Sequence, residues 1–357
     1  MTIVAQFEIP YTQFINEQGQ LTQPIPSSID NTDTLLALYR TMLLIRTFDK
    51  KAIALQRTGK MGTYAPINGQ EAISTAIGHA MQINDVLVPY YRDYAAQVQR
   101  GVKMSDILAY WGGDERGSNF EHCSEDLPIC VPIASQCLHA TGVAFAFQYR
   151  KQPRVAVTCI GDGGTSEGDF YEAMNVAGIW KLPVVFVINN NQWAISVPLD
   201  QQTATQTLAQ KAIAAGFTGE QVDGNDIIAC RAVIGAAIEK ARRGEGPTLI
   251  EALSYRLSDH TTADDATRYQ PSEEVKSAQL REPLFRLKHY LENTGHWDEA
   301  REQQLLQSVT QEVQQAVDTY LAQSPQPVES IFDYHFATLP EYLVEQRAIA
   351  MEEASNA

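Results

Sequence analysis

The chain has 357 residues, 44% of them hydrophobic and 20% charged, which is typical of a globular protein with a large buried core. Its 43 Asp and Glu outnumber its 27 Lys and Arg, and the net charge of −16 excludes a nucleic-acid-binding protein that depends on a general basic field. No apolar run reaches the ~18 residues of a membrane span, and the start of the chain lacks the features of a secretory signal. We therefore expect a cytoplasmic protein, and five cysteines without a CxxC pair favour reduced thiols.

The N-terminal part predicts an extended arm followed by a long helix. Residues 1–32 are polar, interrupted by prolines and without periodicity, so we expect them to lie on a larger body. From Asp33, the expected N-cap, apolar residues recur at helical spacing until Gly59 ends the helix. The predicted apolar stripe consists of Leu35, Leu38, Tyr39, Met42 and Leu43. A second helix is expected over 70–81, and an irregular surface loop over 112–132.

Two buried strands with a helix between them form the predicted centre. The runs VAVTCI (155–160) and VVFVI (184–188) are short, apolar and rich in β-branched residues. Apolar residues recur at helical spacing over 165–180, where Ser166 and Asp169 predict a capping box with Asp in place of Glu. A strand, a helix and a strand in this order imply parallel neighbours.

A helix over 227–243 and a strand over 248–253 extend this pattern to a doubly wound, mostly parallel α/β sheet with helices on both faces. Helical periodicity then continues from 273 to about 322, on Leu280, Leu284 and Leu287. The predicted organisation is an N-terminal arm (1–32), one α/β domain (33–330) and a C-terminal tail (331–357).

Polar residues follow both central strands at the point where each ends. Gly161-Asp162-Gly163-Gly164 comes after the first strand, and Asn189-Asn190-Asn191 ends the second. Carboxyl ends of parallel strands meet at one edge of a sheet, where backbone N–H groups and a helix N-terminus favour phosphate. Mg²⁺ takes one or two protein oxygen ligands and completes its shell with phosphate and water. The carboxylate of Asp162 and the amide oxygen of Asn191 therefore predict a magnesium-diphosphate site.

This loop allows two other interpretations, a plain turn and a dinucleotide-binding loop. A short Gly-Asp-Gly alone is more often a plain strand-to-helix turn. A dinucleotide fingerprint would need Gly or Ala where Ser166 stands, and an acidic residue at the end of the next strand, where the sequence has three Asn. The second strand end therefore favours a diphosphate site over either alternative.

The segment GDGGTSEGDFYEAMNVAGIWKLPVVFVINNNQWAIS resembles the thiamine-diphosphate motif of two-subunit 2-oxo acid dehydrogenases. Over residues 33–295 the chain is similar to the alpha subunit of their decarboxylating component. Further matches, in the same order along the chain, are YAPINGQEA, YRD, QVDGND, GEGPTLIEAL and YRLSDHTTADD. Several of these motifs look closer to bacterial pyruvate dehydrogenases than to branched-chain enzymes.

The resemblance implies a role for individual residues. The implied Mg²⁺ ligands are Asp162, Asn191 and the backbone carbonyl of Trp193. The residues implied at the diphosphate are Gly163, Gly164, Tyr91, Arg92 and Arg256. Those implied around the cofactor's rings are Val131 and Ile133. His260 is the implied catalytic residue, near the reacting carbon and the incoming lipoyl group. Two departures are Ala65, where some relatives have a histidine, and Trp193, where Tyr is commoner.

Without the resemblance, several of these residues have simpler interpretations. Arg92 and Arg256 fit ordinary loop arginines paired with acids, and His260 fits a solvated histidine as well as a catalytic one. An acidic group most simply forms a solvated loop face; its members are Glu115, Glu121, Glu125 and Asp126.

The resemblance also implies cofactors and partners. Thiamine diphosphate supplies the electron sink for decarboxylation, while a separate beta subunit contributes the carboxylate that activates it. The expected assembly is a heterotetramer of two alpha and two beta chains that passes an acyl group to a lipoyl-bearing dihydrolipoamide acyltransferase. Pyruvate is the expected substrate, and a branched-chain 2-oxo acid or acetoin enzyme and a non-catalytic subunit of the same fold are the alternatives. Ser258 and Thr261 lie where eukaryotic relatives are phosphorylated.

Overall fold

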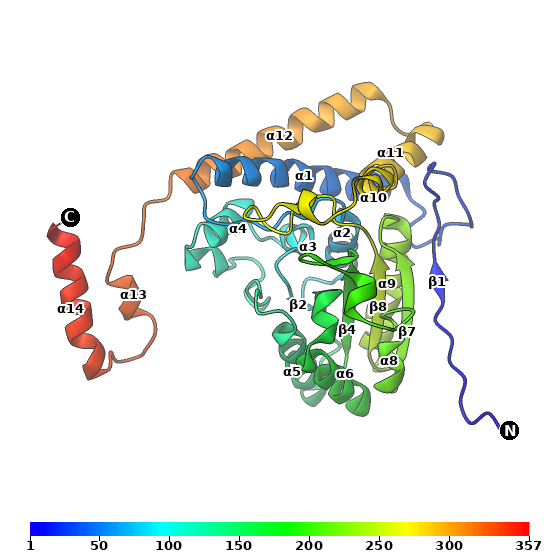
Figure 1. The fold of residues 1–357 in the computed structure, drawn as a ribbon, viewed down its shortest axis with the longest axis horizontal. Coiled ribbons are helices and arrows are strands. Elements are labelled where there is room, and N and C mark those ends of the chain that lie inside the picture. The colour runs from blue at the N-terminus through cyan, green and yellow to red at the C-terminus, as the bar shows by residue number, and fades with distance from the viewer. Residues whose placement is uncertain (357) are drawn as a thin grey trace.

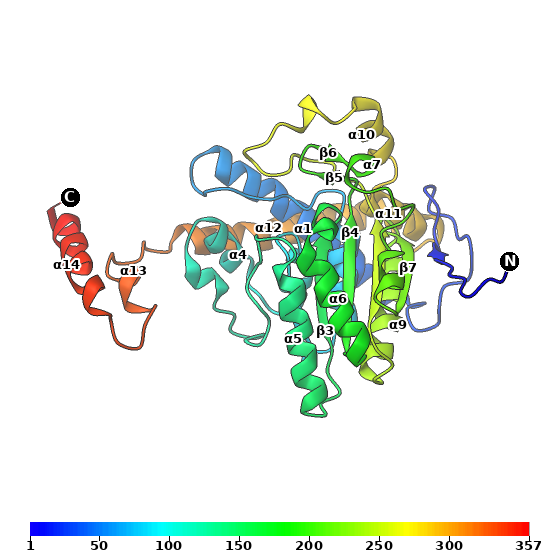
Figure 2. The same ribbon diagram turned by 60° about the horizontal axis from the view of Figure 1, so that its bottom comes forward.

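A six-stranded parallel sheet forms the centre of the protein, which a computed structural model describes over residues 1–356 (Figures 1 and 2). The strand order is β1-β7-β8-β4-β3-β2, and every neighbouring pair is parallel. The strands are β1 (Tyr11–Thr12), β2 (Val86–Val88), β3 (Ala156–Gly161), β4 (Val184–Asn190), β7 (Thr218–Asp223) and β8 (Thr248–Leu253). The predicted parallel α/β sheet is confirmed, and it extends beyond its three predicted strands to include β1, β2 and β7.

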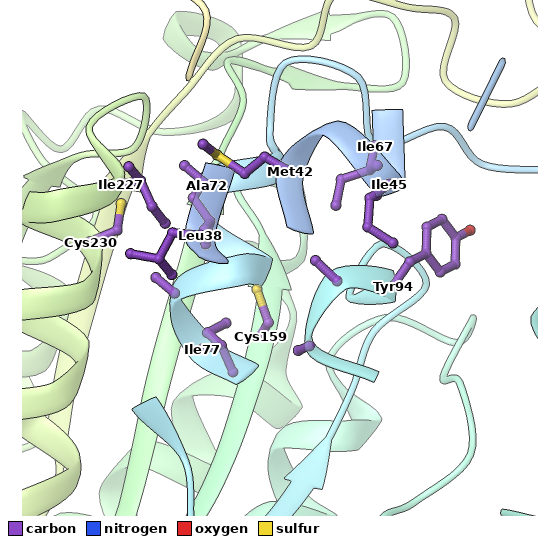
Figure 3. Close-up of a cluster of buried hydrophobic side chains, with 14 of the residues drawn as sticks. Leu38, Met42, Ile45, Ile67, Ala72, Ile77, Tyr94, Cys159, Ile227 and Cys230 are labelled. Carbon is purple, nitrogen blue, oxygen red and sulfur yellow. The ribbon is translucent and has the colours of Figure 1, made fainter. Parts of the chain in front are cut away.

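Both faces of the sheet are apolar because successive strand residues enter different cores. In β4, Val184, Phe186 and Ile188 pack with α5 (Ser135–Tyr149) and α6 (Gly168–Trp180). The alternating residues Val185 and Val187 enter the core on the other face, with α1 (Thr32–Arg57), α2 (Glu71–Ala80) and α9 (Ile227–Arg242). Part of this second core is shown in Figure 3, which labels Leu38, Ile77, Ile227 and Cys230 among its members. Helices on both faces confirm the doubly wound architecture.

The remaining helices flank this body. They are α3 (Tyr94–Gln99), α4 (Met104–Trp111), α7 (Leu199–Gln202), α8 (Lys211–Ala214), α10 (Ser272–Gln279), α11 (Pro283–Asn293), α12 (Glu299–Leu321), α13 (Ser330–Asp333) and α14 (Glu341–Asn356). α12 lies along α1, whereas α13 and α14 extend away from the body and contain no buried residue (Figure 1). Within residues 1–356, every helix is too short or too polar to cross a bilayer.

Two predicted helix starts are wrong. The N-cap of α1 is Asn31, whose Oδ1 accepts the N–H of Asp33 at 2.8 Å, so Asp33 lies inside the first turn. The predicted capping box of Ser166 and Asp169 does not form, because Gly163–Ser166 first makes a separate 3₁₀ turn, η2. α6 then begins at Gly168 without a side-chain cap.

The helical stretch predicted over 273–322 is confirmed and is divided into the three helices α10, α11 and α12. Glu282 caps α11 and Pro283 occupies its first turn, where proline fits but cannot continue the preceding helix. Asp298 caps α12. Leu280 falls at the first break and is 67% exposed, so it does not share the buried face of Leu284 and Leu287.

The loop over 112–132 is largely irregular, as predicted, but one of its acids is buried. Asp126 forms an ion pair with Arg100 and accepts the backbone N–H of Leu87 at 2.8 Å. Its predicted place on a solvated face is therefore wrong, because this carboxylate anchors the loop to β2.

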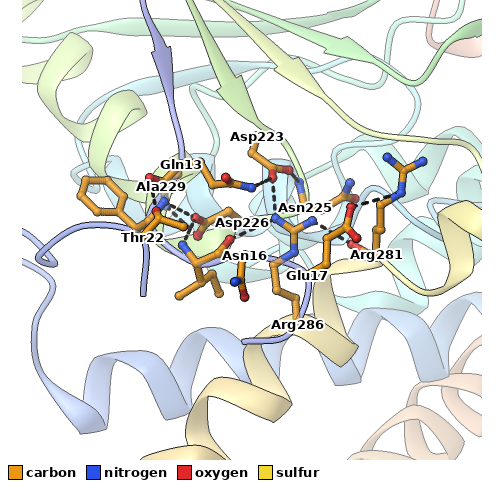
Figure 4. Close-up of polar contacts among 12 residues, drawn as sticks. Gln13, Asn16, Glu17, Thr22, Asp223, Asn225, Asp226, Ala229, Arg281 and Arg286 are labelled. Atoms are coloured by element: carbon orange, nitrogen blue, oxygen red, sulfur yellow. Dashed lines mark hydrogen bonds and ion pairs between the residues drawn. The ribbon is translucent and has the colours of Figure 1, made fainter. Parts of the chain in front are cut away.

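The N-terminal arm is attached to the sheet through the QVDGND segment (Figure 4). β1 pairs with β7, and Asp226 Oδ2 accepts the backbone N–H groups of Phe14 at 2.6 Å and Ile15 at 2.8 Å. The other oxygen of Asp226 caps α9. Asp223 forms a buried ion pair with Arg286 of α11. Two carboxylates thus hold the arm, α9 and α11 together at one edge of the sheet.

Because Asp226 serves the arm and α9 at once, we expect Asp226→Ala to lower the free energy of unfolding by about 2–4 kcal/mol. The matched control is Asp298→Ala, which removes an exposed cap that accepts only the N–H of Arg301 and should cost about 1 kcal/mol. Urea unfolding measures both losses, and equal losses would contradict the double role of Asp226.

Candidate active site

The carboxyl ends of β3 and β4 bring Asp162 and Asn191 together. Gly161 pairs with Asn189 in the sheet, so the residues that follow leave the same edge side by side. Both side chains are nearly inaccessible, with 2% and 3% of their surface exposed. The backbone N–H of Asn191 is also near enough to lower the pKa of the Asp162 carboxyl, as expected for residues that follow adjacent strands.

The Asp162 carboxylate has no cationic side chain as a direct partner among residues 1–356. Its Oδ2 accepts an N–H of Gln202, at the end of α7, at 2.7 Å. Burial raises the pKa of Asp162 above its usual value, and the hydrogen bonds from Gln202 and from backbone N–H groups only partly oppose this effect. A bound cation would lower that pKa and relieve the cost of burying the charge.

Oxygen atoms next to Asp162 suit a hard cation. Asn191 donates through Nδ2 to Gln70 Oε1 at 2.8 Å, which leaves its amide oxygen near the backbone N–H of Trp193, at 3.2 Å. Two buried atoms at this place, Gln70 Nε2 and Gln202 Oε1, have no partner in the described chain. One carboxylate, one amide oxygen and the Trp193 carbonyl fit Mg²⁺, which would take its other ligands from phosphate and water.

No group of three or more His, Cys, Asp or Glu residues within 1–356 could hold a metal ion. The structure therefore offers no protein-only metal centre in that range. A metal at Asp162 would depend on ligands that a phosphorylated cofactor and water bring.

The glycine loop after β3 has no room for side chains at two positions. A Cβ on Gly163 would lie 2.5 Å from Cβ of Ala194, and a Cβ on Gly164 would lie 2.7 Å from side-chain atoms of Ile133 and Ile160. Gly161 has open space around it. Gly163 and Gly164 begin the 3₁₀ turn η2, where the first N–H groups have no acceptor within the turn and are available to an anion.

Arg92 and Arg256 are buried with 1% and 0% exposure, and neither forms an ion pair among the described residues. Arg92 donates to the carbonyls of Pro66 at 2.8 Å and His260 at 2.6 Å. Arg256 donates to the carbonyl of Ile195 at 2.9 Å and, at 3.4 Å, to that of Trp193. The interpretation as ordinary acid-paired arginines is wrong. Two buried guanidinium groups without carboxylate partners favour an anion at this edge.

His260 lies against this cationic pair. Its ring Nδ1 is 3.4 Å from Nη2 of Arg92, and its ring meets that of Tyr91 edge-on at 6.1 Å between centroids. Its backbone N–H donates to Asp264 at 2.8 Å. Burial, followed by the charges of Arg92 and Arg256, lowers the pKa of His260 to about 3. The imidazole is therefore neutral near pH 7, and the residue is half-buried rather than fully solvated.

Of the remaining residues named from the sequence, one lies beside the glycine loop, one is exposed and one is buried. Ile133 packs against Gly164, beside the glycine loop. The side chain of Val131 is 49% exposed, so the structure does not bring it into the packed site. Ala65, where some relatives have a histidine, is fully buried, and its carbonyl accepts the hydroxyl of Tyr94 at 3.0 Å.

Sequence reasoning missed Gln70 and Gln202, which orient the two central side chains. Gln70 lies within the recognised segment YAPINGQEA, but Gln202 follows no motif and is placed only by folding. The backbone next to the site also contains non-glycine residues in the left-handed region of φ. Gln192, Ile195 and Ala134 have positive φ angles of 73°, 54° and 80°, and such strained non-glycine residues gather at functional sites.

Comparison with known proteins is consistent with this geometry. The family model described as dehydrogenase E1 component matches residues 39–329. The chain is 40% identical over 352 residues to a Mycoplasma genitalium protein named pyruvate dehydrogenase E1 component subunit alpha, covering 98% of both chains. A protein of the same name from Staphylococcus aureus is 37% identical, and the match covers 98% of this chain and 95% of that protein. The Bacillus subtilis protein of this name is also 37% identical, with 96% of this chain and 93% of that protein covered.

The chain therefore belongs to the dehydrogenase E1 component family. It is an oxidoreductase component of a thiamine-diphosphate-dependent 2-oxo acid dehydrogenase, which confirms the class predicted from the motifs.

The low pKa of His260 has a measurable consequence. Between pH 6.5 and about 3 the unfolded chain binds a proton on this ring and the folded chain does not, so His260 lowers the free energy of unfolding as pH falls through that window. Nitrogen NMR of the folded chain should show no titration of the ring between about pH 5 and 8. Arg92→Gln should raise its pKa by removing a neighbouring charge. A folded-state titration near pH 6.5 would contradict the burial of this ring.

Proposed function

We propose that this chain is the alpha subunit of pyruvate dehydrogenase (acetyl-transferring), which decarboxylates pyruvate oxidatively and acetylates lipoyl groups reductively. The observation that carries the proposal is the meeting of Asp162 and Asn191 at adjacent strand ends, beside two buried arginines without acidic partners. The names of relatives at 40% and 37% identity support pyruvate as the substrate.

In this proposal the strand ends hold the cofactor by its charged end. Asp162, Asn191 and the Trp193 carbonyl are the Mg²⁺ ligands, an assignment supported by a buried carboxylate without a cationic partner. The diphosphate is bound by the N–H groups of Gly163 and Gly164 and by the side chains of Tyr91, Arg92 and Arg256. When bound, thiamine diphosphate supplies the electron sink for decarboxylation.

The other residues act around the reacting end. Ile133, packed on Gly164, supports the cofactor's rings, and Val131 contributes through its backbone. His260 is the catalytic residue, and its neutral ring nitrogen, held near Arg92, is able to accept a proton or a hydrogen bond as the lipoyl group arrives.

The proposed partner is a beta subunit, in an assembly of two alpha and two beta chains. An apolar face on α5 and α6 supports a partner of this kind. Phe145 is 43% exposed and Trp180 is 52% exposed, with their ring centroids 5.0 Å apart, and contiguous exposed aromatic surface favours a protein interface. In this proposal the α/β domain (33–330) carries the site, and the arm (1–32) and the tail (331–357) are accessory. The protein is cytoplasmic, and a lipoyl-bearing acyltransferase receives the acyl group.

The alternatives predict different results in one assay. The chain alone should turn over pyruvate poorly with Mg²⁺ and thiamine diphosphate, because this site lacks the activating carboxylate. Addition of the beta subunit should raise the rate by orders of magnitude, with pyruvate preferred to a branched-chain 2-oxo acid or acetoin. Robust turnover by the lone chain would contradict the need for a partner, and preference for a branched-chain acid would correct the substrate. No activity with any substrate would favour a non-catalytic subunit.

Replacement of the charged ligand tests the metal site. We expect Asp162→Asn in the alpha-beta assembly to weaken binding of Mg²⁺ and thiamine diphosphate by at least about 100-fold, because a neutral amide replaces a carboxylate. Calorimetry measures the affinity. The matched control, Asp85→Asn, alters a buried carboxylate at the amino ends of the strands, paired with Arg242, and should change stability but not affinity. Unchanged affinity in Asp162→Asn would refute the assignment.

A further inference from the structure

A buried lysine lies directly behind the glycine loop. Lys211 of α8 is 5% exposed, and its Nζ donates to the carbonyl of Thr165 at 2.7 Å and to the Thr165 hydroxyl at 2.9 Å. The same Nζ lies 5.2 Å from the centre of the Tyr171 ring. Lys211 thus contacts η2, the turn that carries the first free N–H groups after β3.

The charge of Lys211 has no acidic partner in the described chain. The lysines that form ion pairs within 1–356 are Lys103 and Lys276, whose pairs lie at the surface, and Lys288, whose side chain is half-buried. A buried ammonium group bound only to neutral groups is costly. An anion bound on the other side of η2 would lower that cost.

Hydrogen bonds connect this ammonium group to the face of the loop that the anion would occupy. The Thr165 hydroxyl, which accepts from Lys211, donates to the carbonyl of Asp162 at 2.7 Å. That carbonyl belongs to the same peptide group as the N–H of Gly163. Bonds in such a chain polarise one another, so a cation at one end strengthens the N–H donor at the other.

We infer that Lys211 is a positioning residue for the diphosphate, acting through Thr165 on the N–H groups of the glycine loop. This inference rests on the proposed function of that loop. Lys211 does not touch the cofactor, and its contribution is an uncompensated positive charge together with a fixed loop conformation.

The first test removes the charge. In the alpha-beta assembly, Lys211→Met should weaken the affinity for Mg²⁺ and thiamine diphosphate by about 10- to 100-fold, as measured by calorimetry. The matched control is Lys240→Met. Lys240 also donates to two hydroxyls and a carbonyl, those of Thr218, Thr248 and Pro247, but at the amino ends of β7 and β8, away from the loop. Its replacement should leave cofactor affinity unchanged.

Two readouts separate this role from a purely structural one. The affinity loss in Lys211→Met should be larger for thiamine diphosphate than for thiamine monophosphate, because the effect depends on the charge of the ligand. Thermal unfolding of the cofactor-free assembly should occur at the same temperature or higher, because an unpaired buried charge has been removed. An equal loss for both ligands, together with a lower unfolding temperature, would overturn the inference.

The second test breaks the connection at Thr165. Thr165→Val should weaken diphosphate binding, and Thr165→Ser, which keeps the hydroxyl, should restore most of it. The double variant of Lys211→Met and Thr165→Val should lose little more than Lys211→Met alone, since both changes interrupt one chain of bonds. If Lys211→Met fails to assemble, the comparison of Thr165→Val with Thr165→Ser still tests the inference. Equal affinity of these two variants for the cofactor then overturns it. Wild-type affinity in Lys211→Met overturns it directly, whereas failure of the wild-type assembly to bind the cofactor would instead refute the proposed function.

Discussion

The parallel pairing of β3 with β4 is the constraint on which the site depends. Because Gly161 is in register with Asn189, the chain leaves both strands at one edge, and Asp162 meets Asn191 there. A shift of this register by one residue would turn one of these side chains to the other face of the sheet. The apolar residues on both faces of β4 prevent such a shift, since each face packs against its own layer of helices. The fold and the site are therefore specified by the same contacts.

Buried charge without a direct ion-pair partner is the common property of the residues around this edge. Asp162 lacks a cationic partner, and Arg92, Arg256 and Lys211 lack acidic partners among residues 1–356. Elsewhere in the same chain, Asp223 and Arg286 form a buried ion pair, and the buried carboxylate of Asp226 accepts four backbone N–H groups. This contrast fits a surface completed by a metal ion and a diphosphate, and it explains the neutral His260, whose pKa is lowered by burial and by the nearby arginines.

Prediction from the sequence succeeded where a pattern is local. The strand runs, the stripe from Leu35 to Leu43 and the glycine loop were recognised because a few adjacent residues carry the signal. It failed where a distant contact decides the outcome. The local sequence around Asp126 predicts a solvated acid, but in the fold this carboxylate is buried in an ion pair with Arg100. Leu280 fits the helical spacing of its neighbours, but the helix ends there because Pro283 begins the next one.

The sequence by itself determined the class of the protein, the three central strands with the helix between the first two, and the two strand ends proposed as the site, because spacing and residue type are preserved in the linear chain. Only the tertiary structure decided which side chains support that pair. Gln202 and Lys211 come from a segment without a recognisable motif, and they reach Asp162 and Thr165 because the chain after β4 folds back over η2. Their positions follow from packing between segments far apart in sequence, and no local pattern records such contacts.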